Sequence, residues 1–300
     1  PEVTGPAGPV VSRRALALLA LLTLVWGTNW PLFPVVLREV SVWTFRALSM
    51  TGAGLLLLTV ARLRGQPLAI PRRHWRAVLL GALIYLAVWN IASALAAVLI
   101  PSGQAAVLGF TMPLWAALIG WGVLGERLSP RQWLAVALAG CGVLLLAWRG
   151  LGAYAQAPLG LALALLSALG WAVGTLIIKR SGVAVPATVL TGWQLLVASV
   201  PITVCALAIG SGSWFWPSPL TLLVMAYITV VPMGIGNVAW FSIVGLLPAN
   251  VAGLSSILVP VVAMVTGALV HGEPLGPVQI AAMACCAAAL ALTMMTPRRG

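Results

Sequence analysis

The sequence predicts an all-α integral membrane protein, with ten transmembrane helices arranged as two inverted five-helix repeats around a central cavity. Its composition, its apolar runs and an internal duplication support this fold. Of the 300 residues, 62% are hydrophobic and only 7% are charged, whereas about a quarter of the residues in soluble domains are charged. A water-soluble fold of this length could not bury so much apolar surface, so the chain must lie in a membrane.

Ten apolar runs are long enough to cross a bilayer, which requires roughly 20 predominantly apolar residues. The short connections leave no room for an extramembrane domain, and we expect residues 1–14 to form an N-terminal tail without a cleavable signal peptide. The predicted spans are 15–36, 42–61, 77–98, 103–124, 132–148, 159–178, 188–209, 219–244, 250–270 and 278–296.

Lysine and arginine are distributed unequally between the two sides of these spans. If the N-terminus is cytoplasmic, thirteen basic residues lie at cytoplasmic ends and three at the other side. Because positive residues concentrate in cytoplasmic loops, we expect both termini to be cytoplasmic. This distribution also explains the net charge of +12. A nucleic-acid partner is not needed to account for it, because the arginines form no patch interleaved with aromatic residues.

An internal repeat relates the two halves of the chain. Residues 101–130 align without gaps with residues 248–277, and ten of the thirty positions are identical. The shared positions include three prolines and the pairs Gly125-Glu126 and Gly272-Glu273. We therefore predict a first five-helix repeat over 15–148 and a second over 159–296.

Because five is odd, the second repeat enters the membrane from the opposite side. Glu126 should then face the cytoplasm and Glu273 the exterior. Inverted repeats allow two halves to exchange conformations and expose a central site to each side in turn. We expect the two glutamates to stabilise the turns in which they lie. The pairs Ser129-Pro130 and Gly276-Pro277, which come shortly after them, should be the N-cap and N1 residues of the next helices.

Four motifs carry a resemblance to a known family. These are "VWGTNW" in the first span, "FRALSMTGAGLLLL" in the second, and the paired segments "GERLSP" and "GEPLGP". From about residue 15 onward, the chain resembles the ten-helix EamA-type branch of the drug/metabolite transporter (DMT) superfamily. Within it, the overall pattern is most similar to bacterial inner-membrane aromatic amino acid exporters. The resemblance implies a bacterial inner-membrane location and a central substrate cavity lined mainly by helices 1, 3, 4, 6, 8 and 9.

Two tryptophans in the first span are candidates for lining this cavity. Trp26 and Trp30 are four residues apart and share a helix face, with Asn29 at its border. A buried indole or amide group needs a hydrogen-bond partner in hydrocarbon. Trp171 is the counterpart of Trp26 in the second repeat, so the two could form facing walls. The alternative for Trp30 is an interfacial aromatic belt.

Further polar and aromatic residues are candidates for substrate binding, although single hydroxyl residues more often join helices to one another. Pro113 and Pro260 occupy equivalent mid-span positions and could act as hinges or as simple packing kinks. The remaining cavity candidates are Tyr85, Trp89, Asn90, Gln104, Thr111, Trp115, Tyr227, Asn237, Trp240 and Ser255.

Charge inside the spans is sparse. Arg46 lies about one turn inside the second span, and we expect it to extend to the outer interface, with Glu39 as a partner, rather than to bind a substrate carboxylate. The absence of a mid-span carboxylate argues against a proton relay and against lipophilic cations as substrates. The absence of a mid-membrane basic cluster argues against phosphorylated sugars.

The predicted function is export of small neutral or zwitterionic metabolites, above all aromatic and other apolar amino acids, by alternating access. We expect a monomer in the lipid bilayer that binds a small molecule, with no catalytic residue, cofactor, metal or nucleic acid. The alternatives are an exporter of nucleobases, sugars or drugs, a non-transporting scaffold or receptor, and an intramembrane lipid-modifying enzyme. The chain has no aspartate, and His74 and His271 are expected on opposite sides, which disfavours the enzyme.

Overall fold

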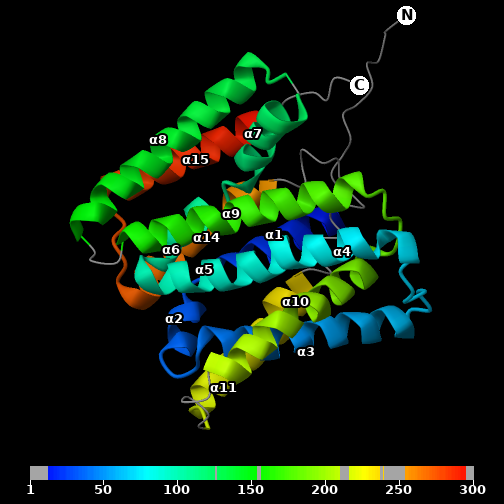
Figure 1. Ribbon diagram of the computed structural model, residues 1–300. Coiled ribbons are helices and arrows are strands. Elements are labelled where there is room, and N and C mark those ends of the chain that lie inside the picture. The colour runs from blue at the N-terminus through cyan, green and yellow to red at the C-terminus, as the bar shows by residue number, and fades with distance from the viewer. Residues whose placement is uncertain are drawn as a thin grey trace, which may run out of the picture.

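The computed structural model (Figure 1) describes residues 13–125, 127–153, 157–209, 216–236, 239 and 254–294. Every regular element in these ranges is helical, which confirms the predicted fold class. The α-helices are α1 (Arg13–Gly27), α2 (Leu32–Leu37), α3 (Val42–Leu63), α4 (Trp75–Gly81), α5 (Val88–Leu99), α6 (Ser102–Gly109), α7 (Met112–Leu124), α8 (Pro130–Ala153), α9 (Ala157–Arg180), α10 (Ala187–Ile209), α11 (Pro219–Ile228), α14 (Leu254–His271) and α15 (Pro277–Met294). A 3₁₀ turn, η1 (Arg72–His74), and two π-helices, η2 (Ala82–Ala87) and η4 (Thr229–Ile235), complete the described elements.

The helices agree with the ten predicted spans in position. Seven helical segments between residues 17 and 209 have the length and hydropathy to cross a bilayer, and shorter apolar helices cover 219–235, 258–271 and 277–289. Several spans contain more than one helix. The first comprises α1 and α2, the third comprises α4, η2 and α5, the fourth comprises α6 and α7, and the eighth contains α11 and η4.

Four spans depart from regular α-helix partway along their length. A turn at residues 28–31 separates α1 from α2, and residues 110–111 separate α6 from α7. In the third and eighth spans, the π-helices η2 and η4 replace a regular turn, and Pro232 lies inside η4. Irregular backbone at membrane depth is tolerated where it is buried in protein or lines a cavity. These four sites should therefore mark the functional part of the bundle.

Helices from the two predicted repeats pack against each other in corresponding pairs. α3 packs along α10, α8 along α15, and α6 against α14. In Figure 1, α8 and α15 lie side by side and run in opposite directions. Glycines allow the α3–α10 pair to approach closely. A Cβ atom at Gly54 would lie 3.0 Å from the carbonyl oxygen of Gly192.

The repeated Gly-Glu motifs have similar local structures at their described residues. Gly125 and Gly272 adopt left-handed conformations, with φ of 69° and 65°, and each follows the last residue of a helix. Such a residue stops a helix, and glycine adopts this conformation without a Cβ clash. Glu126 lies outside the described residues.

The predicted N-caps after these motifs are confirmed. The backbone N–H of Ser129 donates to Gln132 Oε1 at 2.8 Å, and the backbone N–H of Gln132 donates to Ser129 Oγ at 3.3 Å. This is a reciprocal capping box at the start of α8. At the start of α15, the N–H of Gly276 likewise donates to Gln279 Oε1 at 3.2 Å.

Candidate functional site

A cavity of about 90 Å³ lies where the four irregular segments meet. It has room for roughly half a dozen water molecules in this conformation. The turn at 28–31, η2, the α6–α7 junction and η4 each contribute to its wall. The lining residues are Trp26, Asn29, Trp30, Phe33, Arg46, Tyr85, Leu86, Trp89, Asn90, Ser93, Phe110, Trp171, Leu195, Pro232 and Met233.

One wall of the cavity is a continuous aromatic cluster. The rings of Trp89 and Trp171 meet edge to face, with centroids 4.6 Å apart. Tyr85 stacks on Trp171 at 5.8 Å with an interplanar angle of 5°. Trp30 and Phe110 each meet Trp89 edge-on with centroids 6.0 Å apart. Such rings present large apolar faces whose negative π surface can also accept a cation.

Two glycines on α9 bring the π-helix η2 against this wall. Gly170 and Gly174 are four residues apart, a spacing that places two small residues on one helix face and lets a neighbouring backbone approach. A Cβ at Gly174 would lie 2.9 Å from the backbone N of Tyr85, and one at Gly170 would lie 2.8 Å from the carbonyl oxygen of Ile84. This close packing positions Tyr85 for its stack on Trp171.

The polar groups of the cavity divide into satisfied and unsatisfied ones. Trp26 Nε1 donates to the carbonyl of Pro232 at 3.0 Å, and Asn90 Nδ2 donates to the carbonyl of Leu86 at 2.8 Å. By contrast, Asn29 Oδ1 and Ser93 Oγ are buried and have no partner in the described part of the chain. Buried polar atoms without a partner are costly, so these two are candidates for contact with a ligand.

The prediction that Arg46 extends to the outer interface is wrong. Its side chain is 2% exposed and lines the cavity. The guanidinium carbon lies 4.5 Å from the ring centroid of Phe33 and 4.6 Å from that of Phe45. The physical reason is the short helix α2, which places Phe33 over this end of α3 and covers the arginine.

The predicted pairing of Glu39 with Arg46 is also wrong. The Glu39 carboxylate accepts hydrogen bonds from the backbone N–H and the hydroxyl of Ser218, both at 2.7 Å. Ser218 is the N-cap residue of α11. The backbone N–H of a helix start attracts a carboxylate, and this interaction occupies Glu39.

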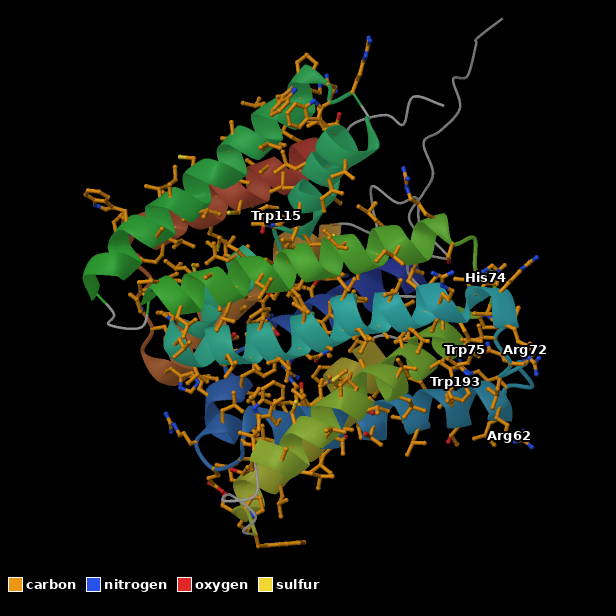
Figure 2. All side chains as sticks on the ribbon, viewed as in Figure 1. Arg62, Arg72, His74, Trp75, Trp115 and Trp193 are labelled. Atoms are coloured by element: carbon orange, nitrogen blue, oxygen red, sulfur yellow. The ribbon has the colours of Figure 1, made fainter. Side chains whose placement is uncertain are left out.

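Seven of the fourteen predicted cavity residues line the cavity, and four others that the structure describes lie elsewhere. Gln104 is buried in α6, and the Thr111 hydroxyl donates to the carbonyl of Leu108 at 2.6 Å. Trp115 is half-buried on α7, on the side of the bundle that carries α8 and α15 (Figure 2). Tyr227 is half-buried on α11 and packs against the main apolar core.

The two proposed hinge prolines differ in their placement. Pro113 lies in the first turn of α7, where a missing N–H costs nothing, whereas Pro260 lies inside α14. Asn237 and Trp240 lie outside the described residues. Ser255 belongs to α14, but its side chain also lies outside the described part.

A second aromatic group lies at the arginine-rich end of the bundle. Figure 2 shows Arg62, Arg72, Trp75 and Trp193 together there. Trp75 and Trp193 meet edge to face at 5.5 Å, and Trp193 Nε1 donates to the carbonyl of Leu68 at 2.8 Å. Arginine and tryptophan concentrate where a bundle crosses the membrane–water interface, so this end marks one edge of the membrane-embedded region.

Comparison with known proteins identifies the family. Residues 13–148 and 158–295 match the model of the EamA-like transporter family. The chain belongs to this family. The EamA-like transporter described here is therefore a multi-pass membrane protein of the DMT superfamily, as its sequence motifs predict.

Relatives of this EamA-like transporter align over most of their length. It is 27% identical over 269 residues to the uncharacterized transporter YvbV of Bacillus subtilis, covering 87% of this chain and 85% of that protein. It is 28% identical over 279 residues to the "Probable amino-acid metabolite efflux pump" of Escherichia coli, covering 90% and 91%. A solved crystal structure superposes with a TM-score of 0.67 at 22% identity, covering 93% of this chain and 95% of the other; this likeness supports the fold alone.

Proposed function

We propose that this EamA-like transporter exports small neutral or zwitterionic metabolites, most of all amino acids with aromatic or other apolar side chains. The observation that carries this proposal is the cavity, which combines an aromatic wall with buried polar atoms that have no described partner. Apolar walls bind an apolar side chain, and a few placed polar groups orient the rest of the molecule.

Alternating access is the mechanism that best fits the packing of the bundle. Corresponding helices of the two predicted repeats pack together, and α8 and α15 run in opposite directions. Two halves related in this way can exchange conformations around a fixed central site. The cavity lies between them, since residues 26–33 belong to one predicted repeat and Trp171, Leu195 and Pro232 to the other.

The names of relatives support an amino acid substrate. The Escherichia coli relative is named a probable amino-acid metabolite efflux pump, and a relative in Salmonella typhimurium carries the same name at 27% identity. We extend that substrate class to this chain, with export as the direction and the substrate gradient as a sufficient driving force. We further propose that a single chain forms the working unit.

Transport into proteoliposomes tests the proposal. Purified protein is reconstituted, and entry of labelled phenylalanine, methionine and threonine is measured without any ion gradient. We expect flux above empty vesicles for at least one of them. Absence of flux for all three rejects the proposal, and saturation of the same pathway by a nucleobase or sugar instead would point to the alternative substrates.

A matched pair of tryptophan variants links the flux to the cavity. Trp171→Ala removes a ring of the aromatic wall, whereas Trp148→Ala removes a tryptophan that is 83% exposed on α8. We expect the first to lose most of its flux and the second to keep it, with equal amounts of both in the membrane. Equal transport by the two variants would exclude the cavity wall from binding.

The orientation is part of the proposal and can be tested separately. We place both termini and the arginine-rich end in the cytoplasm of a bacterium with the protein in its inner membrane. Arg64→Cys and Arg38→Cys introduce thiols at exposed positions beyond the two opposite ends of α3. A membrane-impermeant maleimide should label the Arg38→Cys protein in intact spheroplasts and the Arg64→Cys protein only after lysis; the reverse pattern would invert the topology.

A further inference from the structure

Arg46 is a buried cation held in a fixed orientation. Its Nε donates to the backbone carbonyl of Asn90 at 2.8 Å. Its guanidinium lies within 4.6 Å of the ring centroids of both Phe33 and Phe45. Carbonyl and aromatic contacts stabilise a guanidinium, but they do not neutralise its charge. Among the described residues, only the Asn90 carbonyl accepts a hydrogen bond from this side chain.

No described carboxylate is available to neutralise Arg46. The whole sequence contains four acidic residues. Of the two in the described part, Glu39 is bound to Ser218, and Glu273 is bound to Ser102 and Gly103. An unpaired charge inside a membrane protein is expensive and typically marks the path of a substrate or ion.

We infer that Arg46 binds the carboxylate of the transported amino acid. This assignment rests on the proposed function and names the group that the cavity recognises. A guanidinium presents parallel N–H groups that match the two oxygens of a carboxylate. With Nε on Asn90 and the flat faces covered by Phe33 and Phe45, the remaining N–H groups are left for the ligand in the cavity that Arg46 lines.

Two acceptors in the same cavity suit the amino group of such a substrate. Asn29 Oδ1 and Ser93 Oγ are buried, line the cavity and have no described partner. An ammonium group offers three donors and no acceptor, so it complements these oxygens. The same oxygens leave a substrate without an amino group less well bound, because they would stay desolvated and unpaired.

The cavity therefore selects a molecule with three features. It needs a carboxylate for Arg46, an amino group for Asn29 and Ser93, and an apolar group for the aromatic wall around Trp89 and Trp171. This combination describes an apolar α-amino acid. An amine that carries the same side chain but no carboxylate would leave the charge of Arg46 without a partner. A carboxylic acid without an amino group would leave the oxygens of Asn29 and Ser93 without a donor.

A competition series in the wild-type protein tests this assignment without any mutation. Labelled amino acid exchange is measured in proteoliposomes for the best-transported of phenylalanine, methionine and threonine. The competitors are the unlabelled amino acid, its amino alcohol, which replaces the carboxylate with a hydroxymethyl group, and its deaminated acid. We expect half-inhibition by the amino alcohol, and by the deaminated acid, to require a concentration at least about tenfold higher than that of the unlabelled amino acid, because each analogue loses a charge-assisted contact.

Variants at Arg46 then locate the carboxylate contact. In Arg46→Gln, we expect the amino acid and its amino alcohol to compete equally, whereas Arg46→Lys should keep part of the preference. Arg38→Gln removes the same charge from an exposed position and should behave like the wild type. Full discrimination in Arg46→Gln would overturn the assignment. If that variant fails to assemble, the wild-type series still decides.

The remaining outcomes are distinguishable. If an amino acid is transported but its amino alcohol competes equally in the wild type, the role of Arg46 is wrong and the proposed function stands. If the deaminated acid competes as well as the amino acid, the role of Asn29 and Ser93 is wrong. If sodium acetate inhibits as strongly as the amino acid, Arg46 is only a general anion site, which also overturns the assignment. No flux for any amino acid overturns both the proposed function and this inference.

Discussion

The Glu273 carboxylate caps the first turn of α6. Its Oε1 accepts hydrogen bonds from the backbone N–H and hydroxyl of Ser102, at 2.7 and 2.6 Å, and its Oε2 accepts from the N–H of Gly103 at 3.0 Å. Glu273 follows α14 in the second predicted repeat, whereas α6 belongs to the first. The contact therefore joins the two halves. It resembles the contact of Glu39 with Ser218, in which the glutamate comes from the first predicted repeat and the capped helix from the second.

Glu273→Gln should loosen the contact between α14 and α6. The amide keeps the shape but loses the charge that favours a helix N-terminus, and its NH₂ group cannot accept from the backbone. We expect a loss of about 1–2 kcal/mol of stability for the observed conformation. Thermal unfolding of the purified protein in detergent measures this, and an unchanged Tm would show that the cap contributes nothing to stability.

Gly267→Ala should displace the Glu273 carboxylate from the start of α6. A Cβ at this position would collide with Oε2 of Glu273. Gly122→Ala is the matched control, because nothing lies within 4 Å of a Cβ there. We expect Gly267→Ala to lower the Tm as Glu273→Gln does, and the double variant to be no less stable than either single one. Additive losses would indicate that the two changes act independently.

Glu39 should make stability depend on pH in the acidic range. The backbone N–H of Ser218, followed by its hydroxyl, holds the pKa of Glu39 below the ordinary value of 4.5. A group whose folded pKa is depressed stabilises the protein above its unfolded pKa, and that contribution is lost as pH falls through the folded pKa. Thermal unfolding across the range from about pH 6 down to about pH 3 should therefore show a steeper acid loss in the wild type than in Glu39→Gln. Parallel curves would contradict the contact.

Gly174→Ala should separate η2 from α9. The added Cβ would collide with the side chain of Tyr85 and lie 2.9 Å from its backbone N, and a crowded helix contact of this kind costs about 1–3 kcal/mol. Gly140→Ala, where nothing lies within 4 Å of a new Cβ, is the control on α8. We expect both lower Tm and lower flux for Gly174→Ala only. Wild-type flux would mean that the Tyr85–Trp171 stack is not needed for transport.

Trp89→Ala should weaken binding more than it weakens folding. The ring contacts Trp30, Phe110 and Trp171 at the cavity wall, and losing such contacts to an aromatic substrate should reduce flux about tenfold. Comparing the flux at saturating and at subsaturating phenylalanine separates a loss of substrate affinity from a loss of the folded cavity. A variant whose flux recovers at high substrate has lost affinity, whereas uniformly low flux would indicate a collapsed cavity.

The spans and the aromatic wall could be predicted because both follow from local sequence. Apolar length determines a span, and a tryptophan, tyrosine or asparagine deep inside one needs a partner. Accordingly, the predicted residues that line the cavity are Trp26, Asn29, Trp30, Tyr85, Trp89, Asn90 and Trp171. Their part in binding remains a prediction.

The residues that sequence reasoning missed are those whose role depends on tertiary packing. Phe33, Phe110 and Met233 have the same character as lipid-facing residues, and only the broken helices turn them inward. Arg46 stands near the end of its span, where snorkelling is usual, and the cover provided by α2 is not visible in the sequence. The signal that could have found it was its isolation, because it is the one charged residue within the predicted span 42–61.

The four irregular segments around the cavity have a mechanical consequence. In each of these spans the regular α-helix is interrupted at the level of the cavity, by turns at 28–31 and 110–111 and by the π-helices η2 and η4. An interruption of the hydrogen-bond ladder is where a helix bends most easily. Widening the cavity would therefore require bending at these four points and not the displacement of whole spans.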